Sequence, residues 1–130
     1  MYKETDINNN SVVYKNAEFD DRLLTLASTN TVLQGTILAV SVATGKYIPY
    51  VKDGVTDGNG IPKAVLTYEI FEPAIGDVSV RGMISGVVNA DQLVIYADGD
   101  ASNVDSTVKD LMRDFTIVAL DVFENTNLEA

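Results

Sequence analysis

The sequence predicts a mainly β protein: a small β-barrel or β-sandwich-like domain with one short α-helix in its C-terminal half and an extended N-terminal arm. Three observations lead to this fold class. Short apolar runs with period-two alternation are separated by clusters of Gly, Asp, Asn and Pro, as expected for strands joined by turns. One segment has the period of a helix, and residues 1–18 show no sustained period. A chain of 130 residues has the size of one domain, so we expect residues 19–130 to form a single β-rich unit.

The predicted arm, residues 1–18, reads MYKETDINNNSVVYKNAE. It contains the turn cluster NNNS and is too polar to bury itself, so we expect it to contribute little to the fold. An extended arm can pair with the edge of a partner's sheet and place alternate side chains in pockets. The apolar residues available for such binding are Ile7, Val12, Val13 and Tyr14.

The strands follow the arm as short apolar runs. The segment ATG separates two of them and suits a tight hairpin with Gly45 at a position of positive φ. Pro49 has no N–H, which indicates an edge or an irregularity, while Gly82 and Gly86 indicate the bulges or bends that a small barrel needs. The expected β runs are residues 23–27, 36–42, 46–52, 63–71, 78–88, 92–97 and 115–123.

The helix is predicted within SNVDSTVKDLMRDF, residues 102–115. Its apolar residues recur at i, i+4, i+7 and i+8 from Val104, which places them on one stripe. Ser102, with Asp105 three residues later, resembles a capping box with Asp in place of Glu. We therefore expect the helix to begin near Ser102.

Composition excludes several function classes. The net charge is −10 with only nine Lys and Arg, which argues against nucleic acid and against anionic membranes as partners. The chain has no Cys and no His, so it has no thiolate site, no Ser-His-Asp triad and no usual zinc ligand. No apolar run approaches the length of a membrane span, and no signal sequence is visible. We expect a protein synthesised in the cytoplasm.

The segment DGVTDGNG, residues 53–60, has two interpretations. Asp53, Asp57 and Asn59 could cradle a metal ion, but the same residues with three glycines also suit a turn, since Asp and Asn bond their own backbone. A phosphate-binding loop would open a helix, whereas this one leads into a strand. We favour the turn, with a weak calcium site as the alternative.

A second acidic segment, DGDASNVD, lies at residues 98–105. Asp98, Asp100 and Ser102 match the first three ligand positions of an EF-hand loop. Asn103 then stands where Gly is needed, and Lys109 where the bidentate Glu should be. Acceptors before a helix are explained by capping, so we expect no metal and no cofactor.

Catalysis would have to rest on carboxylates. Asp20 and Asp21 are neighbours in a segment where, if extended, they point to opposite faces, and Glu69 and Glu72 are scattered acids. Solvated surface acids explain all four better than a catalytic pair does. We therefore predict that the protein is not an enzyme.

Three tyrosines support an alternative function. Tyr47, Tyr50 and Tyr68 could line a sugar groove, which would make the protein a carbohydrate- or receptor-binding β module. Aromatic residues on strands more often fill a core or a subunit interface, so this stays the second reading.

The order of these features resembles the lambda head decoration protein D family of tailed bacteriophages. The segments that carry the resemblance are LQGTILAVSVATGKYIPY, TDGNGIPKAVLTYEI, VSVRGMISGVV and ASNVDSTVKDLMRDF, within residues 30–120. The shared parts are Gly35, the pair Gly45-Lys46, the pair Asp57-Gly58, the run Ala64-Val65-Leu66 and the strand around 78–88. Each part is a turn or a strand, and the specificity lies in their order and spacing.

The resemblance implies a structural protein of the virion. It implies binding to the outer surface of an expanded capsid as trimers at local three-fold sites, which stabilises, or cements, the head. The partner would be the major capsid protein, with the N-terminal arm on the capsid-facing side. Neither the resemblance nor the sequence identifies the residues of the trimer interface.

Overall fold

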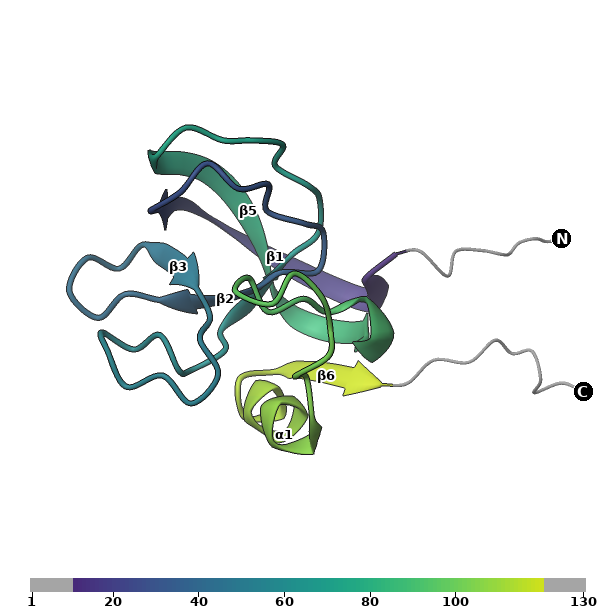
Figure 1. Cartoon of the computed structure of the whole chain (residues 1–130). Helices are drawn as coiled ribbons and strands as arrows, with labels where there is room; N and C mark the ends of the chain where they lie inside the picture. Colours follow the sequence, from purple (N-terminus) through teal and green to yellow (C-terminus); the bar gives the residue numbers. More distant parts are fainter. Residues whose placement is uncertain (1–10, 121–130) are drawn as a thin grey trace, which may run out of the picture.

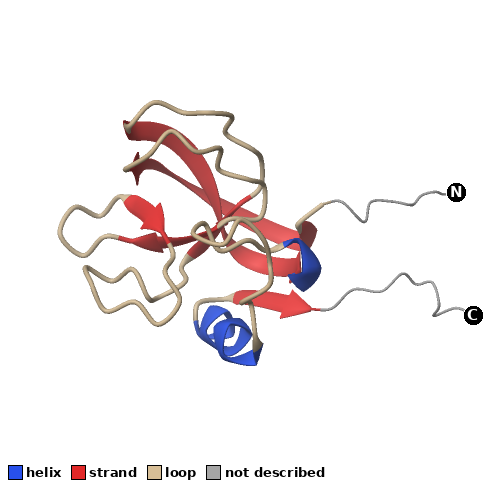
Figure 2. Cartoon of the chain, in the orientation of Figure 1, coloured by secondary structure: helices blue, strands red, loops and turns tan. Residues whose placement is uncertain are grey.

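The computed structural model of the protein describes residues 11–120 (Figure 1). It confirms a mainly β fold with a single short α-helix among these residues. Figure 2 shows strands in the centre, with α1 beside β6 at the lower edge of the view. The elements in chain order are β1 (Val13–Leu26), β2 (Ile37–Val40), β3 (Tyr47–Pro49), β4 (Ala64–Leu66), β5 (Gly76–Asn89), the 3-10 helix η2 (Ala90–Gln92), α1 (Ser106–Asp114) and β6 (Ile117–Leu120).

The strands form a closed five-stranded barrel with one additional strand. Their order is β1-β3-β2-β4-β5-β6, and a further pairing between β1 and β5 closes the ring. β6 lies outside the ring and pairs in parallel with β5. Closure removes most of the unpaired edges that an open sheet would present.

The longest pairing joins β1 to β5 in antiparallel register, from Leu26 opposite Gly76 to Val13 opposite Val88. Its register shifts at three points between Val13 and Phe19, near a backbone irregularity at Asn16. A side chain at Gly86 would meet the carbonyl of Asn16, so this glycine permits the close approach. The bend expected at Gly86 is therefore confirmed, and it lets two long strands wrap around the barrel.

Two groups of buried side chains fill the interior. One group lies under α1 and β6, where Val108 and Met112 of the helix meet Ile117 and Met83. The other fills the opposite end of the barrel, around Leu24, Leu38, Tyr47, Leu66 and Val80. Burial of these apolar surfaces is the main favourable contribution to folding.

The predicted hairpin around ATG is present. β2 and β3 pair with Leu38 opposite Pro49, and Gly45 has a φ of 74°. Pro49 is the last residue of β3, whereas β1 reaches that strand only at Tyr47. The missing N–H of Pro49 therefore removes no hydrogen bond between β3 and β1.

The prediction of a strand at residues 92–97 is wrong. The chain forms η2 after β5, and the Asn89 side chain accepts a hydrogen bond from the Asp91 N–H at its start. Val94 then makes a single β-bridge to Thr36. A turn begins at Ile95, whose carbonyl accepts hydrogen bonds from the N–H groups of Asp98 and Gly99. Local side-chain and turn hydrogen bonds therefore replace an extended ladder.

The helix is confirmed, but its predicted start is wrong. α1 begins at Ser106, and its N-cap is Asp105, whose carboxylate accepts from the Val108 N–H at 3.1 Å. Ser102 instead donates its backbone N–H to Asp100 in the preceding turn. Asp and Ser both suit an N-cap, and pairing of Asp105 with Lys52 favours the later start.

The expected arm boundary at residue 18 does not coincide with the end of a structural element. β1 begins at Val13 and runs through that position. Val12 is 0% exposed and belongs to the core. The expectation that residues 11–18 contribute little to the fold is therefore wrong, because β5 supplies the edge with which they pair. Residues 1–10 lie outside the described residues.

Candidate functional site

The four residues predicted to bind a partner fall in different environments. Val12 is buried, and its N–H donates to the side chain of Gln34 at 3.0 Å. Val13 is half-buried against the core, and Tyr14 follows it in β1. Ile7 lies outside the described residues. Val12 is thus a core residue, and it immediately precedes the start of β1.

The Gly/Asp segment is a turn packed against the β2–β3 loop. The Asp57 carboxylate accepts hydrogen bonds from Ser41 Oγ at 2.5 Å and from the Ala43 N–H at 2.9 Å. These bonds, that of Ser41 first, hold the pKa of Asp57 below its usual value. The side chain of Asn59 accepts from the Thr56 N–H. Hydrogen-bond donors within the chain therefore satisfy the side chains of Asp57 and Asn59, as the turn interpretation expects.

The acidic segment before α1 is also internally bonded. Asp98 accepts from the Asn103 side chain at 2.8 Å, and Asp105 pairs with Lys52 at 2.7 Å. The hydrogen bond to Asp105 raises the pKa of Lys52. Within residues 11–120, His, Cys, Asp and Glu form no group of three or more able to hold a metal ion.

The carboxylates considered for catalysis do not converge. Asp20 pairs with Arg22 at 2.7 Å on β1, whereas Asp21 pairs with Arg81 of β5 at 2.8 Å. The hydrogen bond from Arg81 lowers the pKa of Asp21. Asp20 and Asp21 thus each have their own basic partner, which is an arrangement suited to a solvated sheet surface.

The tyrosines proposed for a sugar groove do not share a surface. Tyr47 and Tyr50 are both 1% exposed. Burial raises the pKa of Tyr47 to about 12, and its hydroxyl donates to the Asp20 carbonyl at 3.3 Å. Tyr68 is partly exposed, and its hydroxyl accepts from the Arg81 N–H. Two of the three rings are therefore unavailable for stacking on a glycan.

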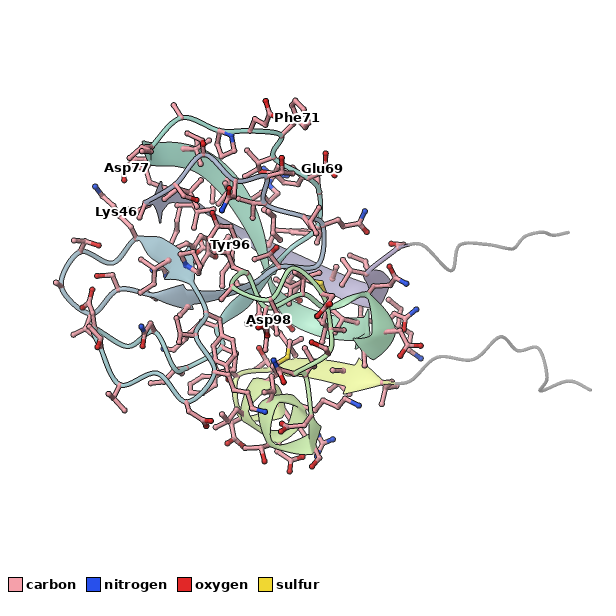
Figure 3. The ribbon with its side chains drawn as sticks, in the orientation of Figure 1. Lys46, Glu69, Phe71, Asp77, Tyr96 and Asp98 are labelled. Carbon is pink, nitrogen blue, oxygen red and sulfur yellow. The ribbon has the colours of Figure 1, made fainter. Side chains whose placement is uncertain are left out.

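Exposed apolar residues in loops are the feature that sequence reasoning missed. Val42 and Val55 are 80% and 95% exposed in the β2–β3 and β3–β4 loops. Phe71, 71% exposed, lies at the outer edge of the β4–β5 loop in Figure 3, and Ile75 follows in the same loop. The only sequence signal is a large apolar residue inside a turn segment rich in Gly, Asp and Pro. Apolar side chains scattered singly in this way are normal on protein surfaces and do not by themselves mark a contact.

Polar side chains and ion pairs also lie on the described surface. One open hollow is lined by Thr29, Asn30, Thr31 and Glu72, between the β1–β2 and β4–β5 loops. Ion pairs cross the barrel surface, such as Lys46 with Asp77 at 2.6 Å, which lie side by side in Figure 3. No helix in the described part of the chain is long and apolar enough to cross a membrane.

These features define a small β-barrel protein whose described surface is built from loops, exposed apolar tips and ion pairs. Residues 8–113 match the family described as bacteriophage lambda head decoration protein D. The chain belongs to this family, which consists of structural proteins of the phage head. No curated protein matches the sequence. The role in capsid decoration that the resemblance implied is thereby supported at the level of the family.

Proposed function

We propose that the protein binds the outer surface of an expanded phage capsid as trimers at local three-fold sites and cements the head. The observation that carries this proposal is the family match over residues 8–113. The partner is the major capsid protein, the protein is not an enzyme, and its place is the outside of the virion. The absence of His and Cys from the whole sequence fits a binding role.

The N-terminal segment is the proposed capsid contact. β1 begins at Val13 and pairs with β5, so the chain that precedes β1 is attached to an anchored strand. We propose that Ile7 binds the capsid and that Val13 and Tyr14 border this contact. Val12 supports it from within the core. An extended segment of this kind gains affinity by pairing with a strand edge of its partner.

The test is decoration of isolated heads. Expanded heads lacking their decoration protein are mixed with the full chain and imaged by electron microscopy. Density at the local three-fold positions is expected, together with a higher temperature of head disruption. A variant lacking residues 2–10 should decorate poorly while keeping its melting temperature. Heads that stay bare with the full chain would refute the proposal.

Single densities away from any three-fold position would refute the trimer while leaving capsid binding intact. Val55→Ser is a matched control for an exposed apolar residue, because this side chain is 95% exposed in a loop remote from the start of β1 (Figure 1). It should decorate as the unchanged protein does.

A further inference from the structure

Hydrogen bonds hold three successive residues where the chain enters the barrel. The Ser11 hydroxyl accepts from the Val13 N–H at 3.2 Å and donates to the Val13 carbonyl at the same distance. Val12, between them, is buried, and its carbonyl accepts from the Asn89 N–H at 2.8 Å. Asn89 ends β5 and is the N-cap of η2, which lies beside the start of β1 in Figure 2. The end of β5 thus holds one side of this entrance.

A side chain, and not a strand, holds the other side. The Val12 N–H donates to the side-chain oxygen of Gln34 at 3.0 Å, across 22 positions of the sequence. A buried N–H without an acceptor costs free energy comparable to that of a lost hydrogen bond. The amide oxygen of Gln34 therefore allows Val12 to lie in the core with both of its backbone groups bonded.

Gln34 lies in a turn that is itself held on both sides. The Leu33 carbonyl accepts from the Thr36 N–H at 3.2 Å and from the Thr36 hydroxyl at 2.7 Å. Gly35, the residue after Gln34, donates its N–H to the Leu66 carbonyl at 2.7 Å. These bonds fix the backbone of Gln34, and a fixed backbone limits the positions that its side-chain oxygen can reach.

We propose that Gln34 is a positioning residue of the N-terminal capsid contact. Its amide oxygen holds the Val12 N–H and thereby keeps residues 11–13 in the arrangement from which the preceding chain binds the capsid protein. This inference rests on the proposed function and specifies it further. The affinity of a protein falls in proportion to the fraction of molecules in the binding-competent arrangement. Loss of the Gln34 oxygen releases the Val12 N–H and lowers that fraction.

A purely structural role would give a different result. A residue that only stabilises the barrel lowers the melting temperature, but well below that temperature nearly all molecules of a two-state protein are folded and bind normally. A positioning residue changes binding by folded molecules, and it does so only when the segment that it positions is present.

The experiment measures binding to expanded heads well below the melting temperature of each form. Gln34→Met keeps the length of the side chain without the amide oxygen, and Gln34→Asn keeps the amide but shortens its reach by one methylene. Both loss variants should bind about tenfold more weakly than the unchanged chain, the factor that corresponds to one hydrogen bond. Gln34→Glu retains an oxygen acceptor and should bind as the unchanged chain does.

Three controls identify the cause of a weaker binding. Gln92→Met is the same substitution at a half-buried glutamine whose backbone carbonyl approaches Gly35, and it should leave binding unchanged. In a chain that lacks residues 2–10, Gln34→Met should not weaken the remaining binding further. Amide hydrogen exchange at Val12 in the free protein should be faster in both loss variants, because the N–H has lost its acceptor.

The outcomes separate the positioning role from the proposed function. If the unchanged chain decorates heads and the loss variants bind equally well, the positioning role is refuted and the proposed function stands. Weaker binding that persists without residues 2–10, or that Gln34→Glu does not restore, also refutes the positioning role, as does unchanged exchange at Val12. If one loss variant fails to fold, the other decides; if neither folds, Gln34 is a structural residue. Heads left bare by the unchanged chain refute both proposals.

Discussion

At the scale of single residues, two glycines with positive φ have different roles. Gly35 has a φ of 94°, and a Cβ there would lie 1.9 Å from the carbonyl oxygen of Gln92. Gly45 has a φ of 74°, yet a Cβ there would meet nothing within 4 Å. The first glycine thus permits a close approach between the chain just before β2 and the end of η2. The second serves only the geometry of a turn.

We therefore expect Gly35→Ala to destabilise the protein far more than Gly45→Ala. The alanine at position 45 incurs the cost of a left-handed backbone, about 1–2 kcal/mol. At position 35 the displacement of backbone around Gln92 is added, for a total of about 3 kcal/mol or more. Chemical denaturation of both variants measures the difference. Equal losses would show that the backbone at the end of η2 moves away at little cost.

At the scale of elements, β1 connects the proposed capsid contact to the core. Val12 is buried immediately before it, and the Asn89 N–H donates to the Val12 carbonyl at 2.8 Å. The N-terminal segment is therefore held at its base. An ordered base lowers the conformational entropy lost when the adjoining residues bind a partner.

Two deletions should differ sharply in stability. Removal of residues 2–10 should leave the melting temperature nearly unchanged, since these residues are mostly polar and offer little apolar surface to bury. Removal of residues 2–14 also takes Val12 out of the core and Val13 from its pairing with Val88, at a cost of about 2–4 kcal/mol. Thermal unfolding followed by circular dichroism measures both. A shorter deletion that unfolds the protein would contradict the placement of the base at Val12.

Sequence reasoning succeeded where a local pattern determines the element. The hairpin around Gly45 and the stripe from Val104 led to β2, β3 and α1 because turn chemistry and helical period act over a few residues. It failed at Val12. The sequence around this valine is mostly polar, and its burial depends on β5, which is distant in the sequence. The exposed Val55 was missed for the same reason, because exposure is a property of the assembled fold.

At the scale of the whole molecule, acids held by basic or hydroxyl partners determine the response to pH. Hydrogen bonds from those partners lower the pKa of these carboxyls below the usual 3.8. They include Asp77, bonded by Lys46 and Thr25, and Asp57, bonded by Ser41. The carboxyls with a lowered pKa are Asp21, Asp57, Asp77, Asp100 and Asp105.

A lowered pKa in the folded state means that the unfolded chain binds protons first as pH falls. The stabilisation is complete above the unfolded pKa and is lost as pH falls through the lower folded values. We therefore expect the melting temperature to be level near pH 6–7 and to fall below about pH 4. Asp57→Asn should lower the melting temperature at neutral pH and reduce the fall in acid. A melting temperature that rises on acidification would contradict this assignment.

The pairing of β1 with β5 also determines the order in which the chain can fold during synthesis. β1 leaves the ribosome first, but its partner residues 76–88 follow only after β2, β3 and β4. The local β2–β3 hairpin can form early, whereas the barrel closes only when β5 arrives and a long loop is brought together. Until then Leu24 and Leu26, which are buried in the finished barrel, remain uncovered. The last strands to be made therefore complete the fold that the first strand begins.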